Sequence, residues 1–156
     1  MNFKKIYRIF IFPYTIFLLY LMFIGFGREQ HETNIVRLLP LVSTILFVQN
    51  TTSWESIIIN LLGNIIMFIP FGFLGWLNGK YFSFKKLIVD FLSVLIIVEV
   101  LQYLTRLGVF DIDDLALNSF GVWIGFQMRK FIDDFNIKYC PNVGDPRRIS
   151  TATSTT

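Results

Sequence analysis

The longest uncharged stretch of the chain runs from Ser56 to Gly79. A helix needs about 20 apolar residues to cross the hydrocarbon core of a bilayer, so this stretch predicts a spanning helix. Its first half contains Asn60 and Asn64. Amides inside a membrane are costly unless they bond to other protein groups. The pattern therefore predicts a membrane helix with one polar side that faces other helices.

Three further apolar segments accompany this one. The predicted helices cover about residues 8–27, 56–79, 86–104 and 111–128. The first follows Lys4, Lys5 and Arg8 as a signal peptide would, but no small-residue cleavage site comes after it, which favours a retained helix. The last is the weakest, because its uncharged part covers only residues 115–128 and spans only if the acidic turn before it lies at the interface.

The remaining segments complete one predicted membrane domain, residues 1–130. Residues 38–48 are apolar, contain Pro40 and are too short to span, which is typical of an interfacial or re-entrant segment. Residues 131–156 are polar and end in a Ser/Thr run. We expect this tail to be disordered and cytoplasmic.

Composition supports a membrane class. Hydrophobic residues make up 54% of the 156 residues and charged residues 16%, whereas a soluble domain has about 25% charged residues. The net charge of +3 is small and the basic residues gather at segment ends, which indicates topology and not nucleic-acid binding. The single cysteine, Cys140, excludes an intrachain disulfide. The predicted fold class is an all-α integral membrane bundle of four transmembrane helices.

Lysine and arginine set the expected orientation. They are dense before the first helix, between the second and third, and after the fourth, and sparse in the other two loops. The positive-inside rule then places both termini in the cytoplasm. In that topology several polar residues share a depth just below the outer surface. This candidate polar cluster comprises Asn60, Asn64, Glu99, Gln102, Asp111, Asp114 and Asn118.

The members of this cluster have structural alternatives. In one alternative the two asparagines only bond helices together. In another, Glu99 pairs with Arg106 or is protonated and bonded to Gln102. Asp113 points away from the stripe that Asp111, Asp114 and Asn118 form, which fits a solvated turn at a helix N-terminus. Three glycines are expected to pack helices closely: Gly72, Gly121 and Gly125.

Three stretches resemble the VanZ-like family of small bacterial membrane proteins. They begin at Asn60 (NLLGNIIMFIPFG), Glu99 (EVLQ) and Phe110 (FDIDDLALNSFG). Their order and spacing are similar to the family pattern from about Trp54 to Met128. The family's Asn-Leu-Ile-Pro-Phe-like stretch is matched only by RLLPL around Pro40, without the asparagine. Many relatives also carry a basic residue three positions before the first Asp, where this chain has Gly108.

The resemblance implies a multi-pass protein of the bacterial cytoplasmic membrane with a role in the cell envelope. The family's founding member is associated with teicoplanin resistance, so lipid-linked wall precursor or a lipoglycopeptide is an expected partner besides the lipid bilayer. A homo-oligomer through Gly121 and Gly125 is a further expectation. No cofactor and no metal is expected.

Three functions stay open. The first is a non-catalytic envelope protein that binds an amphiphile in the outer leaflet. The second is an enzyme acting on a lipid or lipid phosphate, with Asp111 and Asp114 on Mg²⁺ or Ca²⁺ and Glu99 as acid or base. The third is a proton-coupled transporter that uses Glu99. The sequence favours the first and leaves catalysis undecided, because it lacks the common hydrolase motifs and its only histidine, His31, lies in a loop.

Overall fold

The computed structural model describes residues 3–24, 36–37, 54–107 and 110–139. The structural elements are α1 (Phe3–Phe23), β1 (Val36–Arg37), α3 (Trp54–Phe68), the 3₁₀ helices η2 (Ile69–Trp76) and η3 (Gly79–Phe82), α4 (Phe84–Thr105), β2 (Phe110–Asp111) and α5 (Ile112–Tyr139). Apart from the two-residue strands β1 and β2, the regular structure in these residues is helical. The predicted all-α fold class is confirmed.

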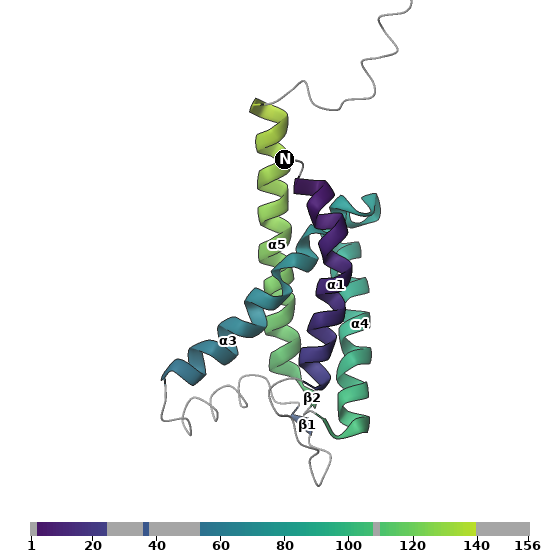
Figure 1. The fold of residues 1–156 in the computed structure, drawn as a ribbon, viewed down its shortest axis with the longest axis vertical. Coiled ribbons are helices and arrows are strands. Elements are labelled where there is room, and N and C mark those ends of the chain that lie inside the picture. Colours follow the sequence, from purple (N-terminus) through teal and green to yellow (C-terminus); the bar gives the residue numbers. More distant parts are fainter. Residues whose placement is uncertain (1–2, 25–35, 38–53, 108–109, 140–156) are drawn as a thin grey trace, which may run out of the picture.

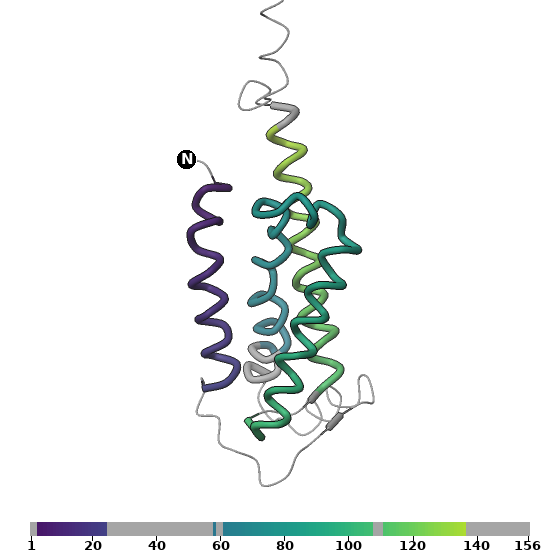
Figure 2. The backbone as a smooth tube through the Cα atoms, turned by 90° about the vertical axis from the view of Figure 1, so that its right-hand side faces the viewer, coloured from purple at the N-terminus to yellow at the C-terminus, as the bar shows by residue number. Residues whose placement is uncertain are grey.

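The helices form an elongated bundle with two distinct ends (Figures 1 and 2). The N-terminus of α1, the η2–η3 connection and the C-terminal half of α5 lie at one end, here called the terminal end. The other end, here called the loop end, holds the last turn of α4, the first turn of α5 and the parallel pair β1–β2. Helices α1 and α4 are long and apolar enough to cross a membrane, while Leu61–Trp76 is a shorter apolar helical stretch.

The second predicted helix is not continuous in the structure. The α-helical hydrogen bonding of α3 stops at Phe68, and the chain proceeds as the 3₁₀ helix η2, which has Pro70 in its first turn. Proline has no N–H, so a carbonyl of the preceding turn loses its intrahelical donor. The hydroxyl of Tyr14 in α1 donates to the carbonyl of Met67 at 2.7 Å. Helix α1 thus supplies a hydrogen bond at the point where proline interrupts the second helix.

Two more side chains of α1 bond to the backbone of η2. The hydroxyl of Tyr7 donates to the carbonyl of Pro70 at 2.9 Å. Arg8 donates from Nε and Nη2 to the carbonyl of Trp76, both at 3.0 Å, at the C-terminal end of η2. Carbonyls at the end of a helix have no intrahelical donor, and a cation there is favourable. Side-chain bonds from α1 to main-chain carbonyls therefore help to attach α1 to η2.

Helix α5 contacts α3 and η2 through glycines. A Cβ atom built on Gly121 would lie less than 3.0 Å from the carbonyl oxygen of Ile65, and one on Gly125 would lie as close to that of Ile69. A Cβ on Gly72 would clash in the same way with the backbone of α5. The absence of side chains lets the two backbones touch, as in small-residue helix pairs.

The apolar core lies between these helices and α4. Its buried members are Leu18, Phe68, Leu87, Leu95 and Val122. Large apolar side chains on the outer faces of α1 and α4 are exposed, for example Phe12 at 71% and Val94 at 61%. Outward apolar faces of this kind suit contact with lipid and not with water.

The ends of the expected segments differ in the structure. Helix α5 continues to Tyr139, whereas the sequence analysis ended the helix at residue 128 and expected the tail from 131 to be disordered. The extension carries stacked rings of Phe131 and Phe135, with centroids 6.5 Å apart, at the i, i+4 spacing that supports a helix. Residues 38–48 and the tail from 140 onward lie outside the described residues.

Candidate functional site

The loop end contains buried polar side chains. Exposed fractions there are 3% for Glu99 and Gln102, 7% for Asp111 and Asp113, and 2% for Asn118. Burying a polar group costs free energy unless it is hydrogen-bonded, and burying a charge costs more. The concentration of such groups at one end of a bundle therefore requires specific partners.

Asn64 and Asp114 form a direct link between two helices. Nδ2 of Asn64 in α3 donates to Oδ1 of Asp114 in α5 at 3.1 Å. The charge on the acceptor strengthens this bond relative to a neutral pair. The bond lies one residue from the Gly121–Ile65 contact on the α3 side, so the polar link and the close backbone approach belong to the same interface.

Asn118 lies between these two contacts. It follows Asp114 by four residues and precedes Gly121 by three, which places all three on one face of α5. That face packs against α3, as the bond to Asn64 and the Gly121 contact show. Among the described residues, no donor reaches Oδ1 of Asn118. An acceptor in this state keeps capacity for a hydrogen bond from a water or a ligand.

The start of α5 has an aspartate cap. Oδ1 of Asp111 accepts a hydrogen bond from the backbone N–H of Asp113 at 2.9 Å, which satisfies one of the free N–H groups of the first turn. Asp111 also belongs to β2, which pairs in parallel with β1 in the register Arg37↔Asp111. Asp113 is 7% exposed, so the solvated turn expected at this position is wrong.

Glu99 and Gln102 lie on one side of α4 near its end. Nε2 of Gln102 donates to the carbonyl of Met22 in the last turn of α1 at 2.7 Å, so this amide caps a neighbouring helix. Arg106, considered as a partner of Glu99, adopts a left-handed conformation with φ 59° at the C-cap of α4 and is exposed. Within the described residues Arg106 forms no ion pair.

The structure therefore gathers most of the predicted cluster at the loop end, with one direct bond between its members, Asn64 to Asp114. Asn60 lies one turn before Asn64 in α3, but its side chain is outside the described part. No group of three or more His, Cys, Asp or Glu among the described residues is arranged to hold a metal ion. The arrangement can accept hydrogen bonds from a polar group through carboxylates and an amide oxygen.

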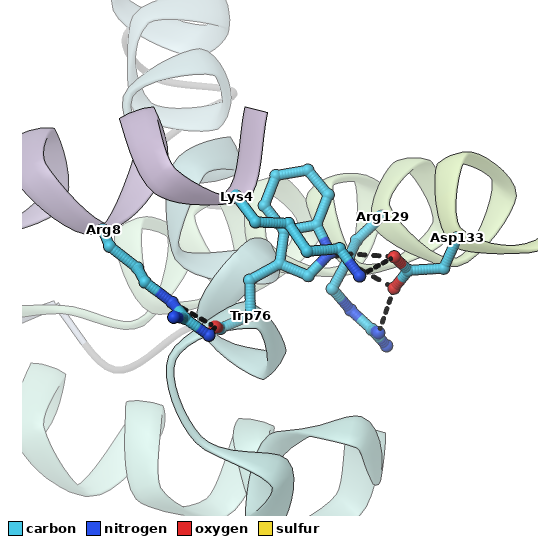
Figure 3. A network of polar contacts seen from close by, with 5 residues as sticks. All are labelled: Lys4, Arg8, Trp76, Arg129 and Asp133. Atoms are coloured by element: carbon cyan, nitrogen blue, oxygen red, sulfur yellow. Dashed lines mark hydrogen bonds and ion pairs between the residues drawn. The ribbon is translucent and has the colours of Figure 1, made fainter. Parts of the chain in front are cut away.

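A second polar cluster, at the terminal end, escaped the sequence analysis (Figure 3). Nε1 of Trp76 donates to both carboxylate oxygens of Asp133, at 3.0 and 3.2 Å. Lys4 Nζ lies 2.9 Å from Oδ1 of the same carboxylate, and Arg129 Nη1 lies 3.1 Å from Oδ2. This cluster, with Arg8 on the Trp76 carbonyl, joins α1, η2 and α5.

Arg129 is the buried member of the terminal cluster, with 3% of its surface exposed. Its guanidinium carbon lies 4.7 Å from the ring centroids of both Phe82 and Phe126, a cation–π geometry. It also fills the space beside Gly75, where a Cβ would lie 3.2 Å from the guanidinium. The i, i+4 spacing of Arg129 and Asp133 was the signal available in the sequence.

Exposed apolar faces and two helices of membrane-spanning length are typical of a helical membrane protein. The chain matches the VanZ/LLP1 family over residues 10–133, and it belongs to that family, as the motifs indicated. It is similar to Protein VanZ of Enterococcus faecium, with 31% identity over 68 residues, 44% of this chain and 42% of the relative. The chain thus matches less than half the length of that relative. No solved structure matches the chain.

Proposed function

We propose that this protein is a multi-pass component of the bacterial cytoplasmic membrane and that its loop end binds the polar headgroup of an amphiphile in the outer leaflet. The occupant is a lipid-linked wall component or a lipoglycopeptide, and binding contributes to glycopeptide (teicoplanin) resistance. Membership of the VanZ/LLP1 family and the similarity to Protein VanZ support an envelope role. Both termini lie in the cytoplasm in this proposal, which fits the basic terminal end.

The observation that carries the proposal is the buried amide of Asn118. Its Oδ1 atom, in the interface of α3 and α5, has no donor among the described residues. Asp114 and Glu99 extend the acceptor character of this end. Acceptors of this kind suit a headgroup with hydroxyl or ammonium donors, while the apolar outer faces of α1 and α4 suit its acyl chain.

Resistance assays test the headgroup site. Glu99→Gln and Asp114→Asn remove charge with little change of shape, so we expect lower teicoplanin resistance in a strain that depends on this gene. Asp134→Asn is the matched control, because Asp134 is exposed on α5 and outside the loop end. Unchanged resistance of both test variants at normal protein levels would contradict the proposal.

Labelling of single cysteines tests the orientation. In a Cys140→Ser background, Arg106→Cys places a thiol at the exposed end of α4, and Lys85→Cys places one at its exposed start. We expect a membrane-impermeant maleimide to label the first in intact cells and the second only after lysis. The reverse result would place the polar site in the cytoplasmic leaflet.

A further inference from the structure

The terminal end carries an excess of positive charge. The described basic side chains there are Lys4, Lys5, Arg8, Lys80, Lys85, Lys86, Arg129 and Lys130, and the acidic ones are Asp90, Asp133 and Asp134. Lys80 forms its ion pair with Asp90. Asp134 is exposed and forms no ion pair within the described residues. The cluster therefore has one carboxylate of its own, Asp133.

Of the three cations in this cluster, two share the carboxylate of Asp133 and the third bonds to a carbonyl. Arg129, being buried between two rings, takes Oδ2 of Asp133, and Lys4 takes Oδ1. Among the described residues, the partner of Arg8 is a neutral carbonyl, that of Trp76. Positive charge beside apolar surface is unfavourable unless an anion compensates it. Among the described residues the cluster thus keeps positive charge in excess of its one carboxylate, which favours binding of an anion.

Two of the three cations are accessible to such an anion. Lys4 and Arg8 are one turn apart on α1, so both side chains leave the same face of the helix. The Lys4 side chain is 45% exposed, and Arg8 is exposed. After Arg8, the exposed side chains of α1 are apolar, including those of Ile9 at 61% and Phe12 at 71%.

We propose that Lys4 and Arg8 bind the phosphate of an anionic phospholipid, whose acyl chains lie along the exposed apolar face of α1. Both side chains keep free N–H donors in the structure, because a lysine has three and an arginine five. Charge-assisted hydrogen bonds to phosphate are strong, and basic sites beside membrane helices suit anionic headgroups. The bound lipid would complete the contact between α1 and the rest of the terminal end.

Thermal unfolding of the full chain in detergent, with added phosphatidylglycerol or phosphatidylcholine, tests this proposal. The measured quantity is the difference in Tm between the two lipids within each variant, which removes any loss of stability caused by the substitution itself. We expect phosphatidylglycerol to raise the Tm of the wild type more than phosphatidylcholine does. The double variant Lys4→Gln/Arg8→Gln should lose most of that difference.

Matched variants separate the site from general charge. Lys85→Gln/Lys86→Gln removes the same charge from exposed positions at the same end and should keep the lipid difference. Lys4→Arg/Arg8→Lys keeps the charge and should keep the difference as well. Equal stabilisation by both lipids in the wild type, or equal loss in the two glutamine pairs, would overturn the proposal. So would an equal effect of glycerol 3-phosphate, which would assign the chemistry to a free phosphate.

Discussion

The two ends of the bundle hold buried polar groups in opposite ways. At the loop end the described charged side chains are four carboxylates, Glu99, Asp111, Asp113 and Asp114, and one exposed cation, Arg106. At the terminal end, cations from α1 and α5 and the indole N–H of Trp76 all contact one carboxylate, that of Asp133. Among the described side chains, carboxylates therefore predominate at the loop end and cations at the terminal end.

The difference indicates two kinds of guest. An end rich in acceptors with an unbonded amide oxygen favours a headgroup that donates hydrogen bonds, whereas an end with surplus cations favours a phosphate. The two clusters also differ in construction. At the loop end, hydrogen bonds donated by side-chain amides link α3 to α5 and α4 to α1. At the terminal end, the Asp133 carboxylate and the Trp76 carbonyl bind groups from α1, η2 and α5.

The largest expected effect on Tm comes from the glycine contacts of α5 with α3 and η2, which lie between the two ends. Gly121→Ala/Gly125→Ala puts methyl groups less than 3.0 Å from carbonyl oxygens of α3 and η2. Overpacking of this kind costs about 1–3 kcal/mol per site, which exceeds the gain in helix propensity of roughly 1 kcal/mol. We expect a large fall in Tm and low yield of monodisperse protein.

Gly63→Ala is the control for this pair, because its Cβ would meet only the end of Met67, at 3.7 Å. Its Tm should equal or exceed that of the wild type. If the Tm of Gly63→Ala and that of Gly121→Ala/Gly125→Ala change by the same amount, the close approach of α5 to α3 does not stabilise the bundle.

The second prediction concerns the carboxylate of the terminal end. Asp133→Asn keeps a group that can accept from Trp76 but leaves Lys4 and Arg129 without a counter-charge. Loss of hydrogen bonds between charged groups costs roughly 2 kcal/mol. We expect a lower Tm and faster proteolysis near the N-terminus as α1 detaches. The Tm of the exposed neighbour variant Asp134→Asn should equal that of the wild type. An equal fall of Tm in both variants would show that the Asp133 contacts contribute no specific stability.

The sequence predicted the loop end better than the terminal end for a physical reason. Asn64, Glu99 and Asn118 interrupt apolar runs, and a polar residue in such a run is conspicuous because its burial is costly. Lys4 and Asp133 flank apolar runs, where solvation is the ordinary expectation. Only the fold brings them together.

The all-α class and two helices of spanning length were also predictable, since they depend on hydropathy and length. The sequence did not predict the change from α-helix to 3₁₀ helix after Phe68. Pro70 lies in this stretch, but proline is tolerated in membrane helices when neighbours satisfy the freed carbonyls. Here Tyr14 does so at the carbonyl of Met67, from a helix that is more than fifty positions away. That arrangement depends on tertiary contacts.

The third prediction separates structural from binding residues at the loop end. Asn64→Leu leaves a carboxylate oxygen of Asp114 without its donor, which costs about 1–3 kcal/mol. Asn118→Leu removes an oxygen that has no donor within the described residues, so its Tm should be close to or above that of the wild type. Resistance should fall in both. If Asn118→Leu lowers Tm as much as Asn64→Leu, then Asn118 has a structural role and no spare capacity for a ligand.

The smallest effect is expected where the terminal end meets solvent. Lys80 lies between η2 and α4, and its hydrogen bond to Asp90 raises the pKa of its ammonium above the ordinary value of 10.5. A raised pKa means that the pair stabilises the fold fully below pH 10.5 and loses this contribution as the pH rises through the folded-state pKa. Because the pair is exposed, salt and solvent weaken it.

Lys80→Gln should therefore lower Tm slightly at neutral pH and reduce the fall of Tm at alkaline pH. Lys85 has no ion pair in the described residues, so Lys85→Gln should follow the wild-type curve. An alkaline fall that is identical in all three proteins would show that this contact contributes nothing, and the surplus charge of the terminal end would then include Lys80 as well.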